Sequence, residues 1–249
     1  MFLRETLAWK TSKVDRFLAA MVLGCLHGES HKSINCFSNR MPRTISTKPN
    51  YSVRWWNDKG CVAPFRDIFK FLRRQVDFRL AGGVPQLVGD ARLGDARNAS
   101  KMFRKLRRKV RLVVTSPPYL DTTDYGEDQW PRLWFLGGAE RPKGRIFADA
   151  RHGSCEAYWA FLKDAWTGMA DLLAPDCTIV IRIGGKSFMP DELEARLFST
   201  FRAGLGSEAL ETIQPRNVSE IKNRQTNAFR PGTKGKRVEY DFTIRAALR

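Results

Sequence analysis

Five consecutive residues, TSPPY at 115–119, combine groups that could bind a planar molecule bearing an amine. They follow VRLVVT at 110–115, a β-branched run typical of a buried strand. Two prolines directly after a strand force the chain into a stiff extended path, so the carbonyls near Ser116 and Pro117 escape helix hydrogen bonds. These acceptors and the Tyr119 ring would form a compact acceptor site with a stacking surface.

Such a site suits the exocyclic amine of a nucleic-acid base. The amine offers two hydrogens to two acceptors, and the ring offers a face for stacking. A base of this kind must swing out of the duplex before it can be reached. The alternative is a structural Pro-Pro turn in which Tyr119 packs as a lid, and the residues alone leave both interpretations open.

Two further strand ends are comparable, because ligands of open α/β sheets bind beyond the carboxyl ends of the strands. An expected strand at 84–88 ends in Gly89 and Asp90, and CTIVIRI at 177–183 ends in Gly184 and Gly185. Asp90 could hold a ligand or cap a helix N-terminus. The second glycine pair could simply let the backbone turn tightly.

TSPPY after a hydrophobic strand resembles the catalytic motif of the amino-methyltransferases, which methylate the amino group of cytosine or adenine with S-adenosylmethionine. The serine-headed form is most typical of DNA enzymes that make 4-methylcytosine. The longer stretches TSPPYLDTTDYGEDQWPRLWFLGG and NRMPRTISTKPNYSVRWW also resemble bacterial modification methylases. The resemblance therefore implies an α/β fold with a Rossmann-like class I methyltransferase sheet.

The resemblance implies a role for each residue of the motif. Ser116 would accept a hydrogen bond from the target amine, and the Pro117 carbonyl would be the second acceptor. Pro118 would shape the turn, and Tyr119 would stack on the flipped base. Positioning of the amine would supply most of the catalysis, without a strong general base.

The same resemblance implies residues that bind the cofactor. Asp90 matches the acidic position that holds the adenine of S-adenosylmethionine, and Thr115 lies at the end of the strand that carries the motif. Residues in the loop that follows could frame the base or close over it, although each has a structural explanation as well. They are Asp121, Asp124, Tyr125 and Trp130.

Three basic segments suit a DNA partner. KMFRKLRRKVR at 101–111 could equally be the solvated face of a helix, and the loop at 39–56, which mixes basic and aromatic residues, could be a structural cap. The segment at 216–237 is the stronger candidate, because a loop can follow phosphates with backbone and side chains. Its expected DNA-binding residues are Arg216, Lys222, Arg224, Arg230, Lys234, Lys236 and Arg237.

Composition agrees with a nucleic-acid partner. The net charge is +17 over 249 residues, of which 43% are hydrophobic, so the chain can build a core. The charge is +9 in residues 1–80 and +8 in residues 81–249, so no single tail carries it. A field of this sign attracts phosphate polymers. The longest apolar run is too short to span a bilayer, and five cysteines without CxxC spacing argue against a disulfide framework or zinc site. We expect a soluble cytoplasmic protein.

Hydrophobic periodicity predicts two regions. In residues 1–80 we expect helices at 14–26 and from Pro64 to about residue 80, joined by a long loop with an extended piece at 51–56. This region would be a recognition or cap segment. In residues 81–249, the catalytic region, we expect strands alternating with helices at 99–109, 156–173 and 191–201. The late strands at 210–214 and 238–246 lack a helix between them, so we expect them to pair antiparallel.

One motif of the resembled family is not found. These enzymes normally carry DPFxGxG after a strand, where the glycines let the backbone approach the cofactor. The one GxG here, Gly204-Leu205-Gly206, follows a helix and is typical of a C-terminal cap. The sheet is therefore expected to be incomplete. A separate polypeptide could supply the motif, the chain could be truncated, or its start could lie upstream. We expect the chain alone to bind S-adenosylmethionine weakly or not at all.

The sequence thus predicts the catalytic and DNA-contacting portion of a cytosine-N4 DNA methyltransferase, acting in restriction-modification or as an orphan enzyme. An adenine-N6 methyltransferase is the closest alternative. A non-catalytic nucleic-acid-binding protein that keeps the fold is the alternative from another class.

Overall fold

The computed structural model describes residues 1–26, 36–37, 49–62, 65–120, 129–141, 154–185, 189–206, 210–212, 217–220 and 238–247. These residues divide into two compact units. The first contains the helices before residue 81 together with a later helix, α7. The second contains the sheet and the helices that pack on it.

The sheet of the second unit is mixed. Its strands lie in the order β1 (Val110–Thr115), β2 (Leu173–Gly185), β5 (Val238–Ala247) and β3 (Leu210–Thr212), and β4 (Asn217–Glu220) also pairs with β5. β1 and β2 are parallel, whereas β5 runs antiparallel to β2, β3 and β4. The α/β class and the antiparallel pairing of the late strands are therefore confirmed.

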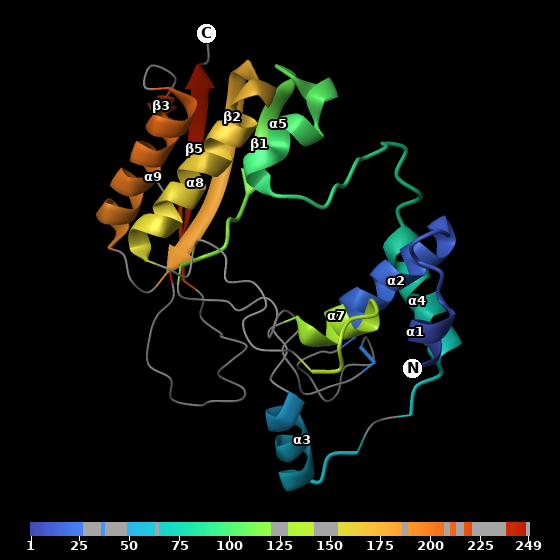
Figure 1. Ribbon diagram of the computed structural model, residues 1–249. Helices are drawn as coiled ribbons and strands as arrows, with labels where there is room; N and C mark the ends of the chain where they lie inside the picture. The colour runs from blue at the N-terminus through green and yellow to red at the C-terminus, as the bar shows by residue number, and fades with distance from the viewer. Residues whose placement is uncertain are drawn as a thin grey trace. The chain divides into compact units, whose positions relative to one another are not determined.

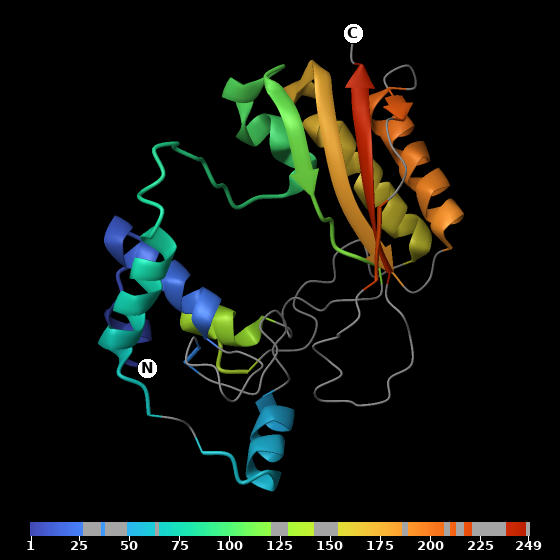
Figure 2. The same cartoon turned by 180° about the vertical axis from the view of Figure 1, so that it is seen from behind.

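Two long helices, α8 (Cys155–Met169) and α9 (Pro190–Leu205), cover one face of this sheet, as the opposite views in Figures 1 and 2 show. α8 buries the residues that recur at helical spacing, including Trp159, Leu162 and Trp166, as predicted. They pack against alternate residues of β2 and β5. The strand residues of this core are Cys177, Ile179, Ile181, Ile183, Tyr240, Phe242 and Ile244.

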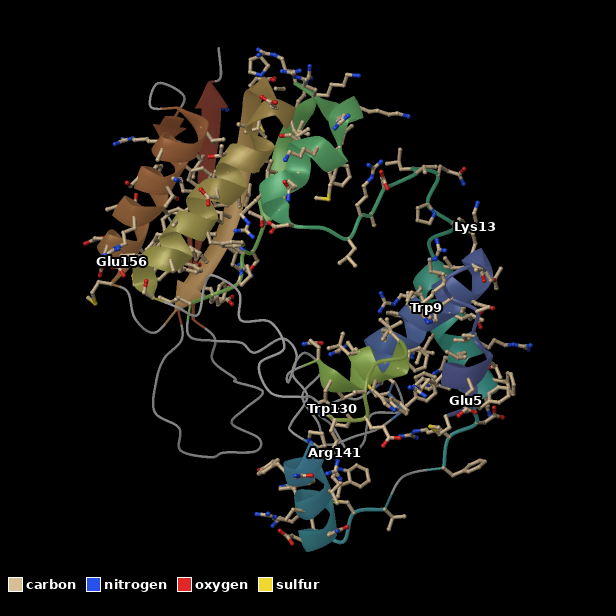
Figure 3. The ribbon with its side chains drawn as sticks, in the orientation of Figure 1. Glu5, Trp9, Lys13, Trp130, Arg141 and Glu156 are labelled. Carbon is tan, nitrogen blue, oxygen red and sulfur yellow. The ribbon has the colours of Figure 1, made fainter. Side chains whose placement is uncertain are left out.

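The ends of these helices follow from local chemistry. The Ser154 hydroxyl accepts a hydrogen bond from the Ala157 amide and caps α8, and Glu156, labelled in Figure 3, places a negative charge in its first turn. α9 ends at Gly206, whose φ of 99° confirms the predicted C-terminal cap. A Cβ at Gly204 would lie 2.8 Å from the Lys163 carbonyl, so glycine allows α8 and α9 to approach closely.

No described helix of this unit covers the opposite face of the sheet (Figure 2). Leu112 and Val114 of β1 are 58% and 72% exposed. The prediction that β1 is a buried strand is therefore wrong for this face. β1 lies at the end of the strand order, and only its other face contacts the core.

Two more predictions for residues 81–249 are wrong. Residues 84–88 form no strand, and Leu87 and Val88 are almost fully exposed, because no described strand lies beside them to accept their backbone hydrogen bonds. The single helix expected at 99–109 is divided into α5 (Ala99–Met102) and the 3₁₀ turn η2 (Arg104–Leu106). Six like charges in this segment disfavour a continuous helix.

The first unit is helical. α1 (Phe2–Thr6), α2 (Lys13–Cys25), α4 (Ile68–Leu80) and α7 (Trp130–Phe135) supply its small core. Its buried members are Ala19, Val22, Cys25, Phe71, Leu72 and Phe135. Arg4 and Arg132 donate hydrogen bonds from their guanidinium groups to the carbonyls of Trp134 and Leu23, which ties α7 to this unit.

Two predictions for the first unit need correction. Residues 51–56 belong to a helix, α3 (Pro49–Asp58), rather than an extended piece. Proline suits the first position of a helix, which explains this start. α4 begins at Ile68 with Asp67 as its cap, and Pro64 lies outside the described residues. Phe71 and Leu72 of α4 are buried, whereas Phe69 is 71% exposed.

Among the described residues, no helix is long and apolar enough to cross a membrane. All five cysteines lie among the described residues, none of them is in a disulfide, and three of them are buried.

Candidate active site at the carboxyl end of strand β1

The motif TSPPY lies where β1 ends. Thr115 is the last strand residue, and residues 116–119 belong to no helix or strand, as the two prolines predict. Ser116 is exposed, Pro117 is buried, and Tyr119 is half-buried against the core beneath the sheet. The turn therefore presents a hydroxyl group next to an anchored aromatic ring.

Hydrogen bonds set the direction of the Ser116 hydroxyl. It donates to the Tyr119 hydroxyl oxygen at 3.4 Å, and the Tyr119 hydroxyl donates in turn to Oε1 of Glu239 at 3.0 Å. A serine hydroxyl has one hydrogen and two acceptor lone pairs. Because the hydrogen points at Tyr119, the lone pairs of Ser116 remain as acceptors. A hydroxyl arranged in this way is suited to receive a donor rather than to act as a nucleophile.

An ion-pair network holds Glu239 in place. Arg182 of β2 lies across from Asp241 of β5 in the ladder, and its guanidinium contacts both carboxylate oxygens at 2.7 Å. The Nη1 atom of Arg182 also lies 3.9 Å from Oε2 of Glu239. A bidentate arginine–carboxylate pair fixes orientation as well as distance. Arg182 therefore anchors the acidic end of the chain that runs from Ser116 through Tyr119 to Glu239.

The pKa values follow these contacts. Burial, together with the carboxylate of Glu239, raises the pKa of Tyr119 to about 12. The hydrogen bonds from Arg182 hold the pKa of the Asp241 carboxyl below its ordinary value, and the same bonds raise the pKa of Arg182. Tyr119 thus stays a neutral hydrogen-bond donor at neutral pH, while Arg182 and Asp241 stay charged.

Gly184 and Gly185 do not form the tight turn that was considered for them. Both remain in β2 and pair with Glu239 and Val238 of β5. Residues opposite each other in an antiparallel ladder share a face of the sheet. Gly184 therefore lies on the same face of the sheet as Glu239, the acceptor of the Tyr119 hydroxyl.

Asp90 does not lie in the predicted setting. It follows no strand, it is exposed, and its carboxylate pairs with Arg92 at 2.8 Å. It caps no helix either, since Asp95 caps the nearby 3₁₀ turn η1 (Ala96–Asn98). Thr115 is half-buried opposite Ile181 of β2.

Several predicted residues fall outside the described part of the chain. They are Asp121, Asp124 and Tyr125 after the motif, and Arg216, Lys222, Arg224, Arg230, Lys234, Lys236 and Arg237 of the basic loop. Trp130 is the first residue of α7, in the first unit (Figure 3).

Sequence reasoning missed Arg182, Glu239 and Asp241. A signal was present, because each is a charged residue inside an otherwise apolar strand, CTIVIRI or VEYDFTI. Alternation assigns them to the face opposite the buried isoleucines. Their mutual pairing could not be read without the register of β2 against β5.

Comparison with known proteins gives few matches. No protein-family model matches the chain, and no curated protein does. The similar solved structures include three of a candidate DNA modification methylase from Thermus thermophilus. Its selenomethionine form is 21% identical, with 61% of this chain and 50% of that chain covered and a TM-score of 0.33. Its native form is 21% identical, with 61% and 52% covered and a TM-score of 0.34.

The third structure is the same protein complexed with S-adenosyl-L-methionine. It is 25% identical, with 61% of this chain and 53% of that chain covered and a TM-score of 0.34. The chain therefore spans about half the length of the solved structures that it matches. Because these TM-scores are low, we infer the function from the chain's own residues.

Proposed function

We propose that this chain carries the amine-binding site of a DNA methyltransferase that transfers a methyl group from S-adenosylmethionine to the exocyclic N4 amine of cytosine. The observation that carries the proposal is the orientation of the Ser116 hydroxyl by Tyr119, at the carboxyl end of a parallel strand. Ligands of open α/β sheets bind at such ends. The resemblance of TSPPY to the motif of these enzymes supports the same role.

In this proposal, each residue of the motif positions the base. Ser116 accepts one hydrogen of the amine, and the Pro117 carbonyl accepts the other. Tyr119, half-buried against the core, supplies a rigid surface on which the flipped base stacks. Glu239 and Arg182 keep the Tyr119 hydroxyl, and through it the Ser116 hydrogen, turned away from the amine. Catalysis would then come mainly from orientation.

S-adenosylmethionine would supply the methyl group, but one of its two expected binding residues, Asp90, does not fit the cofactor as it stands. Asp90, the proposed partner of its adenine, is exposed and its carboxylate is already engaged by Arg92. Thr115 would contact the cofactor from the end of β1. We therefore derive no step through the cofactor and keep the binding of the amine as the function of these residues.

Double-stranded DNA is the proposed partner of the whole chain. The charge of +17 supports it, as do the basic residues at 216–237, a stretch predicted as a loop in which Asn217–Glu220 instead form β4. We also propose that the protein acts in restriction-modification and is cytoplasmic. Residues 1–80 would serve as a cap or recognition segment. A second polypeptide that supplies the glycine motif belongs to the same proposal.

The test is to express the chain and its Ser116→Ala variant in bacteria that lack amino-methylated cytosine, and to measure modified nucleosides in their DNA by mass spectrometry. With a polypeptide that carries the glycine motif co-expressed, we expect 4-methylcytosine with the unchanged chain and none with the variant, while both bind duplex DNA equally. N6-methyladenine instead would redirect the proposal to adenine. Equal DNA binding without any methylation, even with a complementing partner, would favour the non-catalytic binding protein.

A further inference from the structure

A second surface of the sheet unit, at the amino end of β1, concentrates positive charge. Residues 101–111 contain seven lysines and arginines and no acidic residue. They are Lys101, Arg104, Lys105, Arg107, Arg108, Lys109 and Arg111. We call these residues the basic segment. β1 is six residues long, which places the segment roughly 20 Å from Ser116 along the strand.

Part of the basic segment surrounds a hollow of about 340 Å³. Three cations, Lys101, Arg104 and Arg107, line it together with Ser100, Asp171 and Leu172. Asp171 is the single carboxylate among these lining residues. It lies 3.9 Å from Arg107, and both side chains are well exposed, so this pair contributes little. The hollow therefore keeps a net positive charge.

The backbone beneath these charges is fixed rather than loose. Ser100 Oγ donates to the Gly168 carbonyl of α8 at 2.5 Å. The amides of Arg108 and Lys109 donate to the carbonyls of Asp171 and Leu172 at 3.0 and 3.1 Å. Ordering of the backbone is thus completed on folding, so a ligand of this surface need not supply that ordering free energy.

Arg108 of the basic segment occupies a backbone conformation that residues with a side chain rarely adopt. Its φ is 54°, in the left-handed region that favours glycine or asparagine. An arginine at such a position costs of order 1 kcal/mol relative to glycine. The chain also pairs its neighbouring arginines, Arg92 with Asp90 and Arg97 with Asp95, but provides no acid within the basic segment itself.

We infer that the basic segment is a second nucleic-acid contact, which binds phosphates of the duplex away from the target base. A row of phosphates is the ligand that neutralises closely spaced cations without needing a particular sequence. A flat anionic membrane is the poorer match, because Leu106 is the only large hydrophobic side chain that is exposed in the basic segment. This inference rests on the proposed function in one respect only, which is that duplex DNA is the ligand.

The test measures how the affinity for a labelled DNA duplex of about two helical turns depends on salt. The variant replaces Lys101, Arg104 and Arg107 by Gln. We expect its slope of log affinity against log salt to be shallower by roughly 2 to 3, about 0.9 for each lost phosphate contact. A matched control replaces Lys163, Arg202 and Arg245, three exposed cations on α8, α9 and β5, by Gln, and should leave the slope unchanged.

Arg108→Gly is a second variant that keeps the fold, because glycine accepts the φ of 54°. It should reduce the slope by about 1 with little change in melting temperature. An unchanged slope in both variants, or an equal loss in the control, overturns the inference. Loss of binding to vesicles of anionic phospholipid, with duplex binding kept, does the same. Methylation by the unchanged chain and by its Ser116→Ala variant is measured in a separate experiment. Failure of either proposal therefore leaves the other standing.

Discussion

The two ends of β1 use charge in opposite ways. At the carboxyl end, Arg182 is paired with Asp241 and lies near Glu239, and the network orients Tyr119 and Ser116. At the amino end, the basic segment carries cations with almost no acidic partner. Paired charges fix the geometry of their neighbours, whereas unpaired charges attract a ligand from solution. The first arrangement suits chemistry on one base, and the second suits contact with a polymer.

The largest expected effect comes from a substitution that changes only the site at the carboxyl end of β1. Ser116→Ala removes the oriented acceptor, so the methylation rate should fall about a hundredfold to a thousandfold. The affinity for duplex DNA should stay the same, because the basic segment and the basic loop are unchanged. Nucleoside mass spectrometry and a binding titration measure the two quantities. An equal fall in both would mean that Ser116 supports the fold rather than the reaction.

A comparable change at the amino end acts through packing. A Cβ at Gly168 would overlap the Arg97 carbonyl, so Gly168→Ala should lower the free energy of unfolding by about 1–3 kcal/mol. It should also displace the turn that carries the basic segment, because Ser100 bonds to the Gly168 carbonyl. Chemical denaturation measures the loss of stability. Gly82→Ala, where nothing lies near the added Cβ, is the control and should change stability far less.

A smaller effect separates positioning from binding. Glu239→Ala leaves the Tyr119 hydroxyl without its acceptor, so kcat should fall about tenfold while KM for DNA changes little. Glu239→Gln keeps an acceptor oxygen and should recover most of the rate. A rise in KM with kcat unchanged would instead place Glu239 in ground-state binding of the substrate.

The smallest effect is a pH dependence. The pKa of Tyr119 is raised to about 12 from 10.0, so the folded state favours the neutral phenol. The stability that this provides is complete below pH 10 and is lost as the pH rises through about 12. The Tyr119→Phe variant should not show this part of the loss of stability at alkaline pH. Difference titration of phenolate absorbance, with the variant as reference, should show one tyrosine titrating near 12. A titration at the ordinary value would contradict the buried hydrogen-bonded geometry.

Prediction from sequence succeeded where the pattern is local. The helical stripe of α8, the strand at 110–115 and the cap at Gly206 were found because a single period or a single glycine specifies each of them. It failed at 84–88, where an apolar run looks like a strand whether or not a neighbour is present to pair with it. For the same reason it took β1 as buried on both faces.

The sequence by itself determined the candidate chemistry. Two prolines after a strand require an extended turn, and that turn holds Ser116 and Tyr119 within three positions of each other. Only the tertiary structure decided how these groups are oriented, because Glu239 and Arg182 reach Tyr119 from strands far along the chain. Local sequence constrains backbone dihedral angles, but the partner of a side chain depends on strand register, which forms only when the sheet does.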